Sequence, residues 1–256
     1  MIYKTFSFRR ALLLTLIFAA ALALILFALS RLGMDVSRIV SSQRLVPIYN
    51  VATDRPAVSL GINCAWGDDD LPDILAALDR YGVKATFFVV GDWCEKHPQS
   101  LRLIYDAGHE LGSHSDTHPD MSRLDAAGVE AELDGCAEKI AAVTGTQPLL
   151  FRPPSGAYSN TLIETAERLG YRVIQWSVDT LDWKGLSAGE ICSRVLSRLR
   201  RGDIVLLHCG APHTAEALPE LLEGIASLGL EAVPVSELIY HEDYTIDHAG
   251  VQHPAE

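Results

Sequence analysis

Two histidines separated by three residues are the clearest metal-binding candidates in the sequence. His114 and His118 flank Ser115-Asp116-Thr117, and on a helical turn this spacing would place both rings on one face, about 6 Å apart. Neutral imidazole nitrogens are common ligands of Zn²⁺ and similar divalent ions. Two histidines do not complete such a site, so a third ligand must come from another part of the chain. The alternative is a pair of ordinary histidines on a solvated surface.

Further polar side chains follow the apolar runs that we predict to be strands. These residues are Asn63, Cys64, Arg152, Asp179, Asp182, Trp183, His208 and Cys209. In a barrel of parallel strands, the carboxyl ends of the strands meet at one rim, which is where such enzymes place their chemistry. A single polar residue after a strand is usually structural, but clusters after several successive strands predict an active site.

The elements that must position these side chains alternate between strand and helix from residue 57 onward. Short apolar runs predict strands at residues 58–62, 85–90, 110–113, 149–151, 172–178, 204–207 and 231–234. Helical spacing predicts helices at residues 71–81, 98–107, 125–144, 160–169, 188–200 and 214–228. This alternation is typical of an α/β fold with a parallel sheet, either open or closed into a barrel.

Four motifs occur in order along this region. They are His114-Ser115-Asp116-Thr117-His118, Arg152-Pro153-Pro154-Ser155-Gly156, Asp179-Thr180-Leu181-Asp182-Trp183 and Leu206-Leu207-His208. Their order resembles that of the polysaccharide deacetylases, also called the NodB-homology domain or carbohydrate esterase family four. The resemblance spans roughly residues 57–240. Ala-Trp-Gly at residues 65–67 is also similar to the membrane-anchored deacetylases of spore-forming bacteria.

The resemblance implies a distorted (β/α)7 barrel that removes N-acetyl groups from amino-sugar polymers such as peptidoglycan. It also implies a divalent metal, usually zinc. His114 and His118 would be metal ligands, and His208 would be the general acid that protonates the leaving amine. The remaining implied roles are as follows: Asp182 pairs with His208, Arg152 orients the catalytic base, the backbone N–H near Ser155 holds the oxyanion, and Trp183, Leu206, Pro154 and Ser155 form the substrate pocket.

The first motif departs from the family pattern Thr-Phe-Asp-Asp-Gly, in which the first aspartate is the base and the second is a metal ligand. This chain has Gly61-Ile62-Asn63-Cys64-Ala65 instead. Asn63 stands in the base position, and a neutral amide cannot take a proton from water. Cys64 stands in the ligand position, where a thiolate would complete a Cys-His-His zinc site with water as fourth ligand.

Three outcomes follow for catalysis. Zinc alone lowers the pKa of its bound water towards about 7, so some hydroxide would form without a base. Alternatively, Asp68, Asp69 or Asp70 reaches the site, or catalysis is lost. Ser155, where the family usually has an aromatic ring, favours altered or lost activity. The sequence therefore predicts an N-deacetylase, with a catalytically impaired glycan-binding or scaffold protein as the alternative.

The N-terminal segment has a different character from the rest of the chain. Residues 11–29 carry no charge, and Lys4, Arg9 and Arg10 precede them without any acidic residue. A helix of this length rises about 28 Å, close to the hydrocarbon thickness of a bilayer, and positive flanks stay in the cytoplasm. We therefore predict a membrane anchor at residues 1–30, or else a cleaved signal peptide, with the barrel outside the cytoplasm. A linker at 31–56 and a polar tail at 241–256 would flank the barrel at 57–240.

Composition limits the remaining possibilities. The 256 residues carry a net charge of -12, which excludes bulk nucleic-acid binding because such a surface repels phosphate. The five cysteines show no CxxC spacing, and an odd number cannot all pair within one chain, so a disulfide scaffold is not expected. Whether any two of them pair is left open by the sequence.

Overall fold

The computed structural model describes residues 8–31 and 44–255. The chain divides into two units, Met1–Arg44 and Leu45–Glu256. In the first unit, α1 (Phe8–Arg31) is one continuous helix, as predicted. Among the residues described, no helix has both the length and the apolar character needed to cross a bilayer, so the predicted span is not supported. Residues 1–7 of the predicted anchor and 32–43 of the predicted linker lie outside the described residues.

The second unit is built on one parallel sheet, in which β2 is the longest strand and pairs with β3, β8 and β9. Its strands run in the order β6-β5-β4-β3-β2-β8-β7, and β9 pairs with the first half of β2. The bounds are β2 (Ala57–Cys64), β3 (Thr86–Val89), β4 (Glu110–Ser113), β5 (Leu150–Phe151), β6 (Arg172–Val173), β7 (Val178–Asp179), β8 (Ile204–His208) and β9 (Glu231–Val233). Every pairing within this sheet is parallel, as the alternation of strands and helices predicted.

The connection between β6 and β7 shows that the sheet curls almost into a closed barrel. These two strands form opposite edges of the sheet, yet only residues 174–177 separate them along the chain. So short a segment spans at most about 17 Å, and therefore the two edges must approach each other. The predicted distorted barrel of seven strands is confirmed. The single strand predicted at 172–178 is wrong, because the chain crosses from one edge to the other within it.

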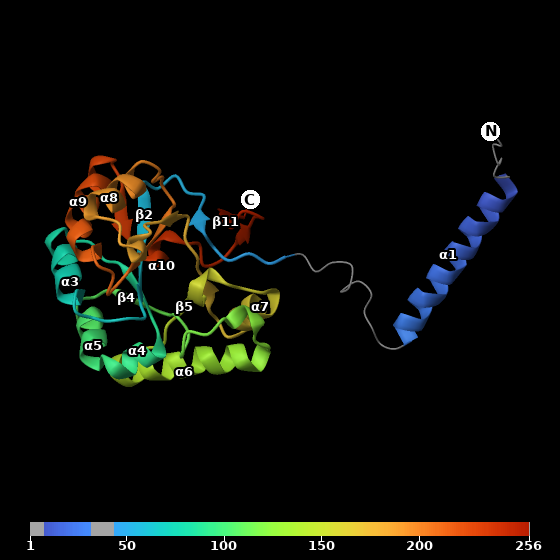
Figure 1. Cartoon of the computed structure of the whole chain (residues 1–256), viewed down its shortest axis with the longest axis horizontal. Helices are drawn as coiled ribbons and strands as arrows, with labels where there is room; N and C mark the ends of the chain where they lie inside the picture. Colours follow the sequence, from blue (N-terminus) through green and yellow to red (C-terminus); the bar gives the residue numbers. More distant parts are fainter. Residues whose placement is uncertain (1–7, 32–43, 256) are drawn as a thin grey trace. The chain divides into compact units, whose positions relative to one another are not determined.

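Helices surround the sheet (Figure 1). Their bounds are α3 (Leu71–Arg80), α4 (Gly91–Lys96), α5 (Pro98–Asp106), α6 (Ala126–Thr144), α7 (Asn160–Arg168), α8 (Ala188–Leu196), α9 (Thr214–Ser227) and α10 (Val235–Leu238). α9 contacts both α8 and α3, while α6 contacts α4, α5 and α7, so neighbouring helices form two continuous groups. Helix α3 is typical: Leu71, Ile74 and Leu78 lie on its buried face, at the spacing that predicted it.

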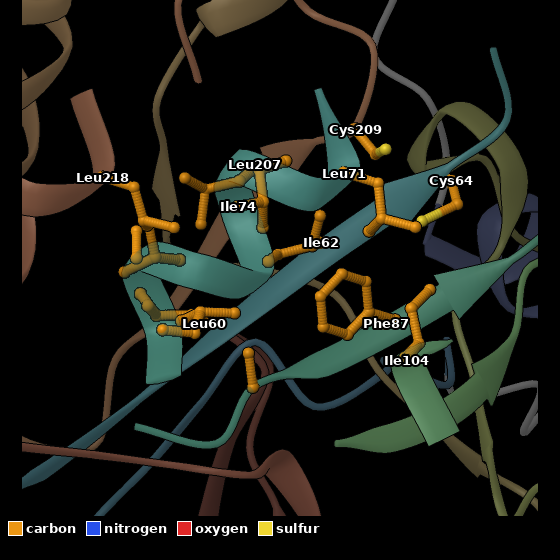
Figure 2. Packing of buried hydrophobic residues seen from close by; sticks show 14 of the residues in the cluster. Leu60, Ile62, Cys64, Leu71, Ile74, Phe87, Ile104, Leu207, Cys209 and Leu218 are labelled. Carbon is orange, nitrogen blue, oxygen red and sulfur yellow. The ribbon is translucent and has the colours of Figure 1, made fainter. Parts of the chain in front are cut away.

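Alternating residues of β2 lie on two different faces of the sheet, one towards the helices and one towards the inside of the barrel. Leu60, Ile62 and Cys64 join the apolar cluster between the sheet and the helices, where Figure 2 shows them beside Leu71, Ile74 and Phe87. The Asn63 side chain and the position that a Gly61 side chain would take lie on the other face, towards Arg152 in the barrel. A Cβ on Gly61 would lie 2.3 Å from the guanidinium of Arg152, so only glycine leaves room for that side chain. Each buried leucine or isoleucine stabilises the fold by about 1.5–3 kcal/mol.

Both ends of the compact unit extend beyond the predicted boundaries. β1 (Asn50–Val51), β10 (Tyr244–Ile246) and β11 (Val251–Pro254) form a small second sheet, in which β11 lies between the other two. Ile48 and Gln252 are fully buried, and the Gln252 side chain exchanges hydrogen bonds with the backbone of Tyr240. The structure therefore includes residues 45–56 of the predicted linker and the predicted polar tail in the compact unit. Their pairing joins distant segments, which local patterns do not reveal.

Candidate active site

A cavity of about 450 Å³ opens at the carboxyl ends of the strands. It is lined by Asn63, Ala65, Trp66, His114, His118, Ser155, Trp176, Asp179, Trp183, Leu206 and His208. Seven of the residues singled out from the sequence as site residues thus come together: Asn63, His114, His118, Ser155, Trp183, Leu206 and His208. Arg152, Asp182 and Pro154 are buried and do not line the cavity. Cys64 does not reach the cavity.

The two histidines of the first candidate pair face each other, with ring centroids 5.0 Å apart. A hydrogen bond to the backbone orients the ring of His114, since its Nδ1 lies 2.7 Å from the backbone oxygen of Arg152. A carbonyl oxygen only accepts hydrogen bonds, so Nδ1 carries the proton and Nε2 keeps a free lone pair. Burial lowers the pKa of His114 well below its usual value and also lowers that of His118. Both rings are therefore neutral near pH 7.

The histidines lie on a loop rather than on the predicted helical turn. Ser115 and His118 adopt left-handed backbone angles, with φ of 70° and 59°, which no α-helix contains. The Ser115 hydroxyl accepts a hydrogen bond from the His118 N–H at 2.9 Å. Glu132 of α6 accepts hydrogen bonds from the N–H groups of Asp116 and Thr117, both at 2.9 Å. Strained backbone held by specific contacts in this way is characteristic of functional sites.

Asp182, which is fully buried, pairs with His208, which lines the cavity. The carboxylate lies 2.8 Å from Nδ1 of His208 and also accepts hydrogen bonds from the His208 N–H and the Thr214 hydroxyl, each at 2.7 Å. Burial alone would raise the pKa of Asp182, but the hydrogen bonds from His208 and Thr214 outweigh it and lower the pKa. The ionised carboxylate orients His208 so that its Nε2 is available to the cavity, as a general acid requires.

Asn63 is held by Arg152 at the position where the resemblance places the catalytic base. Nη1 of Arg152 donates to Oδ1 of Asn63 at 2.9 Å and to the Gly61 carbonyl at 3.1 Å, and Nη2 donates to the Gln175 carbonyl at 3.3 Å. The guanidinium lies 4.0 Å above the Phe88 ring, and its burial lowers the pKa of Arg152 to about 9. All of these acceptors are neutral oxygens. Arg152 therefore orients the Asn63 side chain although no carboxylate is present to pair with its charge.

Cys64 is not a metal ligand in this structure, which corrects the sequence-based expectation. Successive side chains of a strand point to opposite faces, so a residue that follows Asn63 points away from the cavity. Cys64 is fully buried in the apolar cluster, and burial raises its pKa well above the ordinary value. Within residues 8–31 and 44–255, no three histidine, cysteine or acidic side chains converge to hold a metal. Two imidazoles fall short of the three protein ligands of a catalytic zinc site, so the donor set does not fit that metal centre.

The acidic residues after β2 do not reach the cavity either. Asp70 accepts hydrogen bonds from the Gly210 N–H at 2.7 Å and from the Cys209 thiol at 3.3 Å. Asp68 binds Ser100 and His97 instead. Of the described acidic residues, only Asp179 lines the cavity, and its Oδ1 accepts the Leu181 N–H at 2.9 Å. It stands on β7, which β8 separates from β2. No carboxylate in the described part of the chain therefore takes the place of the missing base.

Two tryptophans of the cavity wall were not among the predicted site residues. Trp66 stacks on the ring of His208, with centroids 5.0 Å apart and planes 19° apart, and remains 51% exposed. Its place directly after β2 was the available signal, because that is where the rim begins. Trp176 lies in the connection from β6 to β7. The sequence offered no signal for Trp176, because residues 172–178 read as one strand.

The placement of Cys64 leads to a first prediction. Cys64→Ser should leave the affinity for Zn²⁺ unchanged in calorimetric titration, because residue 64 contacts the core and not the histidine pair. His118→Ala should weaken whatever binding the wild type shows. A loss of Zn²⁺ affinity in Cys64→Ser, in a variant with unchanged secondary structure, would return Cys64 to the metal site.

Comparison with known proteins agrees with this geometry. The family model for polysaccharide deacetylase matches residues 50–174. The uncharacterized protein YlxY of Bacillus subtilis is 38% identical over 193 residues, which cover 75% of this chain and 60% of YlxY. The peptidoglycan-N-acetylmuramic acid deacetylase PdaA of Bacillus subtilis is 32% identical over 195 residues, which cover 75% of this chain and 74% of PdaA. This chain therefore spans less than two thirds of YlxY but most of PdaA.

Solved structures show the same relationship. Wild-type BA3943 of Bacillus anthracis, described as a CE4 family pseudoenzyme, has a TM-score of 0.72 and 31% identity, and the match covers 82% of this chain and 73% of BA3943. A BA3943 mutant described as having restored enzymatic activity has a TM-score of 0.73 and 35% identity, with coverage of 75% and 71%. With the ordered motifs and the barrel in place, these similarities show that the chain belongs to the polysaccharide deacetylase family.

Proposed function

We propose that this protein binds N-acetylated glycan in its cavity and hydrolyses it poorly or not at all. The observation that carries the proposal is Asn63, an amide in the base position, held by Arg152 with no carboxylate among the described residues able to replace it. A positioned general base contributes about 10²–10⁴-fold to rate. The pseudoenzyme BA3943 among the similar structures supports the same interpretation.

The features that would bind a sugar are retained. Trp66 and Trp183 line the cavity and are 51% and 48% exposed, so each offers an open aromatic face. Pyranose rings present apolar C–H faces that pack on aromatic rings, while their hydroxyls need polar partners at the edges. The neutral rings of His114 and His118, together with Asn63, supply such partners. The cavity thus has the apolar walls and few polar groups of a small-molecule site.

The proposal predicts measurable binding that depends on Trp66. N-acetylglucosamine oligomers added to the full chain should change tryptophan fluorescence in a saturable way. Trp66→Ala should weaken this binding by about tenfold, because an aromatic contact is lost. Leu103→Ala, an exposed apolar truncation on α5, is the matched control and should bind like the wild type. Equal affinity in wild type and Trp66→Ala would remove Trp66 from the binding site.

A second candidate function is slow N-deacetylation, which the intact Asp182–His208 pair favours. That pair can still protonate a leaving amine, although the base half of the reaction is absent. Acetate release from the same oligomers separates the two candidates, with Zn²⁺, Co²⁺ or Ni²⁺ present because the family's enzymes use divalent metals. Release by the wild type that His208→Ala abolishes would establish a deacetylase and overturn the non-catalytic proposal.

We also propose that the compact unit acts outside the cytoplasm, on cell-wall or related glycan. The support is the sequence of the N-terminal segment, where Lys4, Arg9 and Arg10 precede an uncharged run. Protease added to intact cells should degrade an epitope tag at the C-terminus. Protection of the tag in intact cells, with digestion after lysis, would contradict an external location.

A further inference from the structure

Cys64 and Cys209 lie opposite each other at the ends of two neighbouring strands. β2 and β8 pair in parallel up to Asn63 and His208, and Cys64 and Cys209 are the residues that come next on the two segments. The backbone continues the ladder at this point, since the Cys209 N–H donates to the Asn63 carbonyl at 2.9 Å. Directly opposed residues on neighbouring strands have Cα atoms about 5 Å apart, which is within the range of disulfide-bonded cysteines.

The two side chains also point to the same face of the sheet. Both belong to the apolar cluster and both are fully buried (Figure 2). The Cys209 thiol donates to Asp70 at 3.3 Å, and Cys209 lies near enough to Cys64 to add, after burial, to the raised pKa of the Cys64 thiol. Disulfide formation needs neighbouring Cβ atoms as well as a short Cα separation, and in-register residues of adjacent strands carry their side chains next to each other on one face.

We propose that Cys64 and Cys209 form a disulfide bond when the chain folds in the presence of a disulfide oxidant. One thiolate attacks a sulfur of the oxidant and displaces one of its halves as a thiol. The second cysteine then attacks the mixed disulfide and displaces the other half. The two cysteines together lose two protons and two electrons, and the oxidant is reduced to two thiols.

Burial determines when this exchange can occur. Both sulfurs are closed off from solvent in the folded chain, and burial raises the pKa of the Cys64 thiol, which suppresses the reactive thiolate. The bond therefore forms before the core closes, and not by oxidation of the finished fold. Once formed, it ties the strand ends that carry Asn63 and His208 to the cavity wall. The inference does not depend on the proposed glycan binding.

The other cysteines have different surroundings. Cys136 donates to the Val89 carbonyl and Cys192 to the Ala217 carbonyl, both at 3.3 Å, and each lies on a helix. Cys94 lies on α4 and has no strand register with either member of the pair. Of five cysteines, we therefore expect two to be paired and three to remain thiols.

The test is a refolding experiment on the full chain in detergent. Protein unfolded in reductant is refolded in a mixture of reduced and oxidised glutathione, alkylated, and digested without reduction. Mass spectrometry should find a cross-linked peptide that joins Cys64 to Cys209, and thiol titration should find three free thiols. Cys209→Ser should lose the cross-link, while Cys192→Ser, the matched control, should keep it. Five alkylated cysteines, or a cross-link to Cys94, would overturn the proposal.

A second measurement guards against variants that fail to fold. The oxidised wild type should melt about 10 °C higher than the same protein refolded in reductant, because the bond would close a long loop in the unfolded chain. Oxidant added to the already folded, reduced protein should not reproduce this shift within hours. Equal melting temperatures for the two refolded forms, with all five thiols free, would again refute the bond.

Discussion

Asn63→Asp should turn a chain that releases little or no acetate into one that hydrolyses N-acetylglucosamine oligomers at least about 100-fold faster than the wild type. The new carboxylate would occupy the place of the amide, whose Oδ1 already accepts a hydrogen bond from Arg152. It would line the same cavity as His114 and His118, and it would lie next to His208, its register partner on β8. The guanidinium would favour the ionised form of the introduced carboxyl group, which is the form that accepts a proton.

The reaction should need both halves of the acid–base machinery. Acetate is measured for wild type, Asn63→Asp and the double variant Asn63→Asp/His208→Ala, each with and without added Zn²⁺. Asn63→Gln serves as the matched control, because it keeps an amide and should stay inactive. A folded Asn63→Asp protein with wild-type rates would show that more than the base is missing, and would direct attention to the incomplete metal donor set.

Activity has been restored by mutation in one of the similar structures. A mutant of the pseudoenzyme BA3943 is described as having restored enzymatic activity. Its match to this chain covers 75% of the residues at 35% identity. A pseudoenzyme of this family can therefore regain activity by mutation, which motivates the Asn63→Asp test.

Asp182→Ala should destabilise the compact unit by about 3–5 kcal/mol, the largest stability effect we expect from a single polar side chain. The fully buried carboxylate accepts hydrogen bonds from His208, Trp183 and Thr214, and its removal leaves the buried Thr214 hydroxyl and the partly buried donors of His208 and Trp183 without this partner. Urea unfolding at pH 7 measures the difference. Asp69→Ala is the control, because Asp69 is exposed, and its effect should stay within about 0.5 kcal/mol.

The pH dependence of that difference follows from the lowered pKa of Asp182. A carboxyl group with a lowered pKa in the folded state stabilises the fold fully above its unfolded pKa of about 3.9. This contribution is lost as the pH falls from there through the lower folded pKa. The gap between wild type and Asp182→Ala should therefore be constant from pH 7 to about pH 5 and narrow below about pH 4. A gap that widens on acidification would contradict an ionised Asp182.

The order of strands and helices was largely readable from the sequence, because each has a local pattern. Leu71, Ile74 and Leu78 predicted α3, and the apolar run at residues 58–62 predicted β2. Elements formed by pairing between distant segments were missed, as with β1, β10 and β11. The strand predicted at residues 172–178 failed for the same reason, since only the curl of the sheet separates β6 from β7.

In the site, too, some features follow from local sequence patterns and others only from the tertiary structure. The types and spacing of His114, His118 and His208 indicated the cavity, since parallel strands bring their carboxyl ends to one rim. The alternation of side chains along β2 also predicts a core position for Cys64, because every second residue lies on the same face and Leu60 and Ile62 are core residues. The motif position predicts a metal ligand at residue 64, whereas the alternation of the strand predicts a core residue, and the structure has the core residue.

By itself, the sequence determined the family, the succession of strands and helices, and the presence of an amide where a base is needed. These properties depend on residue type and on local period, which a single chain displays directly. Only the tertiary structure decided that Cys64 faces Cys209, that Arg152 holds Asn63 through neutral acceptors, and that no described carboxylate replaces the missing base. Such facts depend on which distant residues share a space, and that is set by how the sheet curls and how the helices pack on it.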